Sequence, residues 1–136
     1  MSTTALDGIR VLDFTRVLAG PYCTVLLGDL GAEIIKIENP EGGDDTRGFN
    51  VSPTLEFSTY FLAVNRNKKS IAIDIRTEAG GEAIHALAAN ADIVVENYRT
   101  GVMDRYGIGY EDLSAINPRI IFASVSAYGR EGPLKD

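Results

Sequence analysis

Residues 9–38, IRVLDFTRVLAGPYCTVLLGDLGAEIIKIE, read as a strand, a helix and a second strand in succession. Residues 9–14 are largely apolar, which is typical of a parallel strand that is covered on both faces and lies centrally in its sheet. Gly20 followed by Pro21 predicts a helix that begins near Pro21, because proline suits the first helical position. Gly31 can supply the left-handed residue that ends this helix.

Apolar residues recur at helical spacing along this helix and form one face. They are Tyr22, Val25, Leu26 and Leu30. Residues 33–38 predict the next strand. Two parallel strands joined through a helix cross over with a right hand, so the loop TRVLAGP opens at the carboxyl edge of the sheet, where α/β proteins bind ligands.

The rest of the chain continues the alternation of strand and helix. Thr77 is a good N-cap for a crossover helix that ends near Asn90 and is weakened by Gly80 and Gly81. We expect further strands at residues 70–75, 92–96 and 119–125, further helices at 56–64, 102–106 and 110–116, and irregular structure at 39–55. The pattern predicts an α/β fold with a Rossmann-like, mostly parallel sheet and crossover helices.

The last predicted strand, residues 119–125, reads as buried, yet only a strand-end loop follows it. A sheet of this class covers both faces of its strands with helices. We therefore expect a fold that is incomplete at the C-terminus, with residues 1–136 forming the N-terminal part of a larger domain.

Composition narrows the class of protein. The 136 residues carry a formal net charge of −6, which argues against a nucleic-acid partner. No apolar run is long enough to cross a bilayer, and the N-terminus lacks the pattern of a secretory signal, so we expect no membrane association and a cytoplasmic location. The single cysteine, Cys23, has no partner at metal-ligand spacing, and we expect a packed core thiol and no metal site.

The loop TRVLAGP also excludes some chemistry. Glu38 stands where an acid would meet a ribose, but the loop has one glycine and bulky residues inside the turn, so it does not predict nicotinamide or flavin binding. No P-loop, zinc-protease or esterase motif is present in the sequence. Asp13 reads as a carboxylate that bonds loop amides, and Asp74 as a residue on a less covered face. The only histidine, His85, reads as a solvated or packing residue.

Cations and amides cluster in the predicted strand-end loops, which converge on one crevice. They are Arg16, Arg47, Asn67-Lys68-Lys69, Arg76, Asn97-Tyr98-Arg99 and Arg105. Guanidinium groups pair bidentately with phosphate, so this set predicts a phosphorylated, nucleotide-like ligand.

Four separated segments make the sequence similar to a known family. They are LDGIRVLDFTRVLAGPYCTVLLGDLGAEIIKIENPEGGDDTRGF, NRNKKSIAIDIRTEAGGEAI, ADIVVENYRTGVMDRYGIGYEDL and NPRIIFASVSAYGREGP. Together they resemble the N-terminal part of class III CoA-transferases, a family that includes formyl-CoA and carnitine CoA-transferases and has α-methylacyl-CoA racemases as relatives. The turn DFTRVLAGP and the segment GDDTRG resemble the transferases, especially those that use dicarboxylic acids such as succinate.

The resemblance implies that the crevice binds coenzyme A or an acyl-CoA as substrate, without a metal. At matching positions, Val17, Leu18 and Ala19 would lie along the pantetheine and thioester end. Ile73, Ile75 and Arg76 would border the adenosine and its phosphates. A further set would also contact coenzyme A: Asn97, Tyr98, Arg99, Arg105 and Lys135.

Two positions depart from the family pattern. Leu18 replaces a glutamine of formyl-CoA transferases, which puts formate or oxalate specificity in doubt. Asn39 stands where some members have an arginine, so one phosphate contact is expected to be lost.

The family's reaction implies a catalyst that this chain lacks. In these enzymes an aspartate attacks the acyl-CoA thioester, an aspartyl-CoA thioester forms through a mixed anhydride, and an incoming carboxylate then takes over the CoA. That aspartate belongs to a segment downstream of GREGP, so Asp136 is not the nucleophile and no catalytic residue is assigned here. We expect the isolated chain to be inactive, and the full-length protein to form an interlocked homodimer.

Two other functions remain open from the sequence. One is a short CoA-binding or regulatory module. The other is a fragment of an α-methylacyl-CoA racemase, which would exchange the proton at the α-carbon instead of carboxylates.

Overall fold

The computed structural model describes residues 4–49 and 57–135. Along the chain the elements are β1 (Arg10–Asp13), α1 (Ala19–Asp29), β2 (Glu33–Glu38), the 3-10 helix η1 (Asp45–Gly48), α2 (Thr59–Asn65), β3 (Lys68–Ala72), α3 (Glu78–Ala88), β4 (Ile93–Glu96), α4 (Val102–Arg105), α5 (Tyr110–Ile116) and β5 (Ile121–Ser124). The alternation of strand and helix predicted from the sequence is confirmed.

The five strands form one sheet in the order β3-β2-β1-β4-β5. Every neighbouring pair is parallel, and the central strand β1 is in register with both neighbours, Leu12 opposite Ile35 on β2 and Val94 on β4. From β1, the next strands β2 and β3 are added toward one edge of the sheet, whereas β4 and β5 are added toward the other edge. The boundary between β1 and β4 is therefore the topological switch point, where ligands bind in open α/β sheets.

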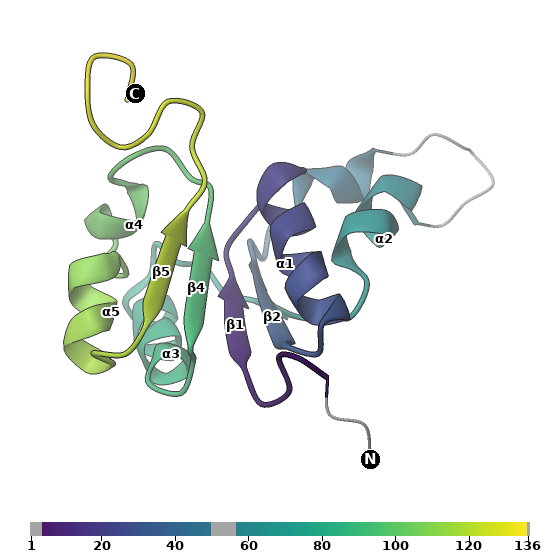
Figure 1. Cartoon of the computed structure of the whole chain (residues 1–136). Coiled ribbons are helices and arrows are strands. Elements are labelled where there is room, and N and C mark those ends of the chain that lie inside the picture. The colour runs from purple at the N-terminus through teal and green to yellow at the C-terminus, as the bar shows by residue number, and fades with distance from the viewer. Residues whose placement is uncertain (1–3, 50–56, 136) are drawn as a thin grey trace.

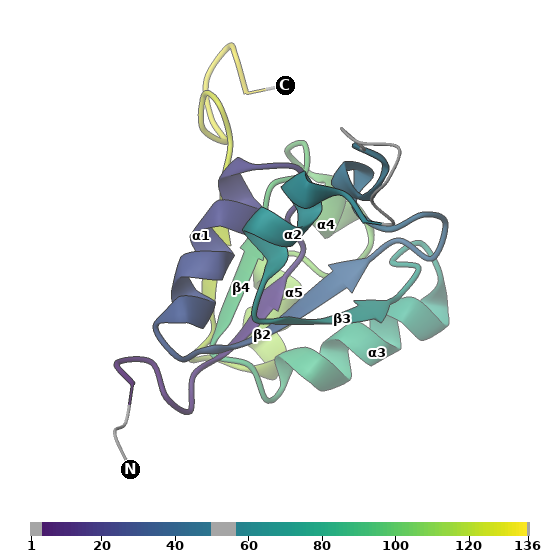
Figure 2. The same cartoon turned by 90° about the vertical axis from the view of Figure 1, so that its right-hand side faces the viewer.

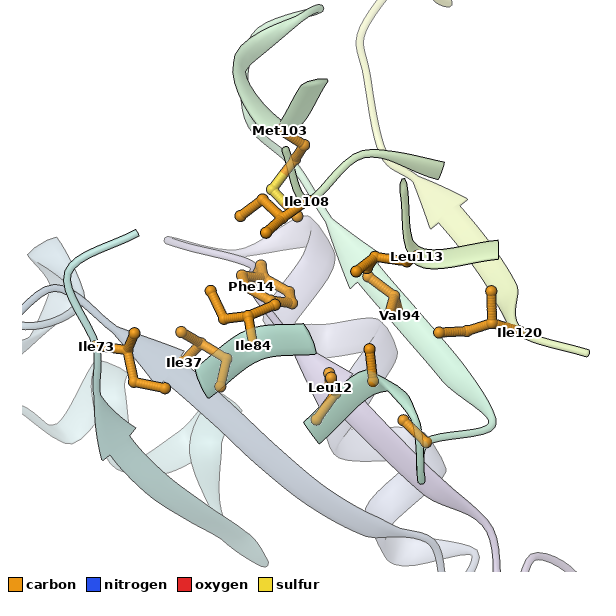
Figure 3. Close-up of a cluster of buried hydrophobic side chains, with 12 residues drawn as sticks. Leu12, Phe14, Ile37, Ile73, Ile84, Val94, Met103, Ile108, Leu113 and Ile120 are labelled. Carbon is orange, nitrogen blue, oxygen red and sulfur yellow. The ribbon is translucent and has the colours of Figure 1, made fainter. Parts of the chain in front are cut away.

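Helices lie on both faces of the sheet. Figure 2 places α1 on one side of the sheet and α3 on the other, and Figure 1 shows the strand arrows ending at a common edge. The larger core lies between the sheet and the helices α3, α4 and α5, where Leu12, Phe14, Ile84 and Leu113 are fully buried (Figure 3). The core on the α1 side is smaller and has Val11, Ile34 and Val95 at its centre.

Helix α1 approaches the sheet through small residues instead of large ones. Gly20, Thr24 and Gly28 recur every four residues, and a Cβ on Gly20 would stand 2.4 Å from the Thr15 Cβ. Of the predicted apolar face, Val25 is fully buried, but Tyr22 (54%), Leu26 (44%) and Leu30 (50%) are exposed, so most of that face is turned away from the sheet. The same rotation exposes Cys23, so the prediction of a core thiol is wrong.

Several predicted boundaries shift. Helix α1 begins at Ala19, and Pro21 is its third residue, which is tolerated because the first-turn amides have no partner within the helix. Gly31 has the predicted left-handed conformation, with φ 106°. Strand β3 begins and ends earlier than residues 70–75, and α2 begins after residue 56, which lies outside the described residues.

The last strand, β5, is not buried as predicted. Ile121 is 61% exposed, and Figure 1 shows the face of β5 on the α1 side without a helix over it. Among the described residues, no helix is long and apolar enough to span a membrane.

Candidate functional site

Three cavities adjoin along the carboxyl edge of the sheet. A central cavity of about 270 Å³ lies between the loops that follow β1, β2, β3 and β4, and Thr15, Glu38, Ile73 and Tyr98 are among its lining residues. A turn cavity of about 560 Å³ lies at the start of α1, and an α3 cavity of about 400 Å³ lies at the start of α3. The central cavity shares lining residues with each of the other two, so the three cavities are neighbours, and together they are called the groove below.

Most of the residues singled out in the sequence line this groove. The turn cavity is lined by Val17, Leu18, Ala19, Asn97, Tyr98 and Arg99. Ile73, Ile75 and Arg76 line the central cavity, and Arg105 lines the α3 cavity with Ile75 and Arg76. Lys135 lines none of the three cavities, but its carbonyl accepts a hydrogen bond from Thr100 Oγ1 at 3.0 Å, beside the loop after β4.

A buried ion pair closes the floor of the groove. Lys36 Nζ on β2 lies 2.9 Å from Asp44 Oδ2, and both side chains are at most 1% exposed. The two groups are not aligned as a hydrogen bond. Burial opposes ionisation of Asp44, but hydrogen bonds from Thr46 and the charge of Lys36 outweigh it and lower the pKa of the carboxyl group.

Glu38 ends β2 and forms a second network. Its carboxylate accepts hydrogen bonds from Arg47 Nη2 at 2.6 Å, from Ser70 Oγ at 2.5 Å and from the Asp44 amide at 2.8 Å. Burial disfavours the charged form, but these three donors outweigh it and lower the pKa of Glu38 to about 2. Both carboxylate oxygens therefore have protein partners, which agrees with the exclusion of a ribose contact.

The predicted cluster of free cations is only partly present. Asn67 directly precedes β3, and Lys68 and Lys69 begin it. Because β3 is parallel to β2, these residues lie at the amino edge of the sheet, away from the groove. The sequence pattern could not indicate this, because the predicted strand began at Ser70, and Lys68 and Lys69 then read as part of the preceding loop. Lys68 is buried and donates to Asp13 Oδ2 at 2.9 Å.

Most of the remaining cations form ion pairs with carboxylates. Arg16 pairs with Asp45, and Arg76 contacts Asp74 through Nε at 2.8 Å and Nη2 at 2.9 Å. Arg99 and Arg105 form no ion pair with residues 4–49 or 57–135, which leaves them as the cations of the groove without a carboxylate partner there.

Tyr98 lies where the turn cavity and the central cavity meet. Its amide donates to Glu96 Oε2 at 2.8 Å, which fixes the first turn of the loop after β4. Burial raises the pKa of the Tyr98 hydroxyl, so the group stays neutral.

The other two candidates have structural roles, as predicted. Asp13 is fully buried and accepts hydrogen bonds from the Thr15 amide at 2.9 Å and from Thr24 Oγ1 at 2.6 Å. His85 Nε2 lies 2.7 Å from the Gly107 carbonyl oxygen, a contact that joins α3 to the loop after α4. Within the described ranges no group of three His, Cys, Asp or Glu side chains could hold a metal ion.

Sequence reasoning missed Lys36 and Asp44. Lys36 interrupts an otherwise apolar strand, EIIKIE, and a charged residue in a strand that is buried on both faces requires a partner. The need for such a partner was the signal in the sequence that could have pointed to a buried ion pair. The partner itself could not be read from the sequence, because it depends on how the loop after β2 folds back.

The sequence model of the protein family described as CoA-transferase family III matches residues 6–136 of this chain. Succinyl-CoA:glutarate CoA-transferase of Mus musculus is 52% identical over 133 residues, which cover 98% of this chain and 30% of that protein. Formyl-CoA:oxalate CoA-transferase of Rhodopseudomonas palustris (strain TIE-1) is 47% identical over 134 residues, covering 98% of this chain and 31% of that protein.

A solved structure agrees with these relatives. The crystal structure of a CAIB/BAIF family protein from Brucella suis superposes with a TM-score of 0.92 at 45% identity, and the match covers 98% of this chain and 36% of that one. This chain spans about 30% of the length of the curated relatives described above. The match across residues 6–136, together with the agreement in fold, establishes that the chain belongs to CoA-transferase family III.

Proposed function

We propose that this chain forms the coenzyme A-binding part of a CoA-transferase, which moves CoA between an acyl-CoA and a free carboxylic acid. One observation carries the proposal. The residues that the family resemblance marks for coenzyme A, all except Lys135, line the three neighbouring cavities of the groove at the carboxyl edge of the sheet.

The groove has a chemical gradient that suits this ligand. Its turn cavity offers apolar side chains, Val17 and Leu18, where the pantetheine and thioester would lie. Ile73 and Ile75 offer apolar contact for the adenine at the other end. Arg105 would meet phosphate there with Arg76, and Arg99 is available beside the turn cavity.

We propose a dicarboxylic acid as the acceptor. The support is indirect: the Mus musculus relative is named for succinyl-CoA and glutarate, and the Rhodopseudomonas relative for formyl-CoA and oxalate. Leu18 stands where formyl-CoA transferases have a glutamine, which argues against formyl-CoA and oxalate as the substrates. The groove described here does not by itself select an acid.

We further propose that the attacking carboxylate comes from outside this chain. Five carboxylates line the central cavity, and those of Glu38, Asp44, Asp45 and Asp74 are held by cations. A carboxylate that is held in an ion pair is a weak nucleophile. The 136-residue chain should therefore not exchange CoA between succinyl-CoA and glutarate, and measurable exchange would overturn this part of the proposal.

The remaining proposals concern the complete protein. Residues 1–136 would form the N-terminal part of its large domain, and the complete protein would be a cytoplasmic, interlocked homodimer. The exposed face of α1 and the uncovered face of β5 are compatible with contacts of this kind.

Titration of the ¹⁵N-labelled chain with coenzyme A, followed by NMR, tests the binding proposal. The amides of Val17, Ile75 and Tyr98 should shift, because they border the groove. The amides of Lys69 and Arg119, at the amino edge, should not shift. Shifts confined to the amino edge, or no shifts at saturating ligand, would refute the proposal, and inorganic phosphate at equal ionic strength is the control for non-specific anion binding.

A further inference from the structure

The turn after β1 contains a backbone conformation that valine rarely adopts. Val17 has φ 68°, in the left-handed region, where its branched side chain crowds the backbone. The next residue, Leu18, is the N-cap of α1 and makes no side-chain capping bond. Nothing in the local sequence therefore favours this shape, and the surrounding structure must impose it.

One constraint comes from the loop after β4. Asn97 Oδ1 accepts a hydrogen bond from the Arg16 amide at 2.8 Å, and Asn97 Nδ2 donates to the Arg16 carbonyl oxygen, also at 2.8 Å. The side-chain amide thus pairs with both backbone groups of Arg16, as a neighbouring strand would.

The other constraint comes from β2 and the loop after it. Lys36 Nζ donates to the Thr15 carbonyl oxygen at 2.7 Å, and Asp44 Oδ1 accepts from the Val17 amide at 3.3 Å. Four consecutive backbone groups, from the Thr15 carbonyl to the Val17 amide, are therefore held by side chains from two different strand ends. Because Lys36 and Asp44 are buried and paired with each other, neither can move without exposing a charge to an apolar interior.

We propose that Asn97, Lys36 and Asp44 are positioning residues that hold Val17 in its left-handed conformation and so shape the wall of the turn cavity for the thioester end of the ligand. This inference rests on the proposed function, because the ligand is an acyl-CoA. It assigns a new role to Asn97, which acts on the ligand through the turn, and it gives the buried ion pair a role in binding.

The test compares Asn97→Ala with Asn90→Ala. Asn90 follows α3 at the amino edge, and its side chain also bonds a backbone carbonyl, so it is a matched control. Two probes are used: succinyl-CoA, which reaches the turn cavity, and adenosine 3′,5′-bisphosphate, which ends before it. A third readout needs no ligand: the NOE between the amide and Hα protons of Val17, which is strong only when φ is positive.

Asn97→Ala should weaken the Val17 NOE and reduce the affinity for succinyl-CoA about tenfold, since two hydrogen bonds to the turn are lost. The affinity for the bisphosphate should stay the same, and Asn90→Ala should change none of the three readouts. If Asn97→Ala does not fold, Asn97→Asp replaces it. This variant keeps the shape and the acceptor for the Arg16 amide but loses the donor to the carbonyl, and it should also weaken the Val17 NOE.

Three results would overturn the inference: an unchanged NOE, a weakened NOE with unchanged affinity for succinyl-CoA, and an equal loss of both ligands. An unchanged NOE with a loss of succinyl-CoA alone would make Asn97 a direct ligand contact instead. If the wild-type chain binds neither probe, the proposed function fails, and the NOE comparison alone decides whether these residues hold the turn.

Discussion

Most charged side chains at and beside the groove are paired with a side chain of opposite charge. The cations Arg16, Arg47 and Arg76 each face a carboxylate, and Lys36 is buried against Asp44. Sequence alone could place these cations near strand ends, but not their partners, because the partners lie in loops whose path depends on the whole fold. The structure therefore narrows the unpaired cations of the groove to Arg99 and Arg105, within the part of the chain that it describes.

Glu38 should make stability depend on acid pH. Its pKa is lowered from 4.5 to about 2, so its stabilising effect is complete above about pH 4.5 and is lost as the pH falls toward 2. The shift corresponds to about 3 kcal/mol. Glu38→Gln should lose much of this at pH 7 and show a flatter decline of stability between pH 4.5 and 2, measured by urea unfolding.

The control for Glu38 is Glu111→Gln, an exposed glutamate that forms no ion pair with the residues of the described ranges. It should leave the acid dependence of the wild type in place. If Glu38→Gln and the wild type lose stability in parallel between pH 7 and pH 2, the role given to the Glu38 network is wrong.

Val17→Gly should stabilise the chain. Glycine adopts φ 68° without strain, and the Val17 side chain is 38% exposed and loses little packing. Relief of strain exceeds the added entropy of the unfolded chain, for a net gain of about 0.5 to 1 kcal/mol. Leu18→Gly is the matched control, since its φ of −128° offers no strain to relieve, and it should be destabilising. Urea unfolding compares the two, and a destabilised Val17→Gly would contradict the assignment of strain.

At the scale of elements, the hydrophobic pattern predicted which elements form but not which face of α1 turns inward. Large apolar residues normally mark the inner face of a helix. In α1, Gly20, Thr24 and Gly28 face the sheet because the buried Asp13 needs the Thr24 hydroxyl, and because a close approach leaves no room for larger side chains. The four-residue repeat of small residues was the usable signal, and it was masked by the leucines beside it.

The two adjacent glycines of α3 should respond in opposite ways to alanine. A Cβ on Gly80 would lie 1.9 Å from the Asp74 carbonyl oxygen, whereas nothing lies within 4 Å of a Cβ on Gly81. Gly80→Ala should therefore cost about 2 kcal/mol through backbone displacement. Gly81→Ala should gain about 0.5 to 1 kcal/mol through helix propensity. Thermal unfolding of the pair measures this, and equal effects would mean that α3 packs differently on the loop after β3.

At the scale of the whole molecule, the order β3-β2-β1-β4-β5 brings the loops after β1 and β4 together at the switch point. Sequence reasoning reached this edge because strand ends can be read from patterns, and it placed most of the marked residues there. It misplaced residues 67–69, because the start of β3 was set two residues too late. The chain spans about 30% of the length of the curated relatives it matches, so the central claim about this chain concerns binding.

Calorimetric titration of the chain with coenzyme A tests that claim most directly. Arg76→Ala combined with Arg105→Ala should weaken binding at least about tenfold, because charged hydrogen bonds to phosphate are lost. Arg66→Ala combined with Arg119→Ala, which removes two exposed arginines before β3 and β5, should leave the affinity unchanged. Equal affinity in both double variants, or no binding by the wild-type chain, would contradict the account.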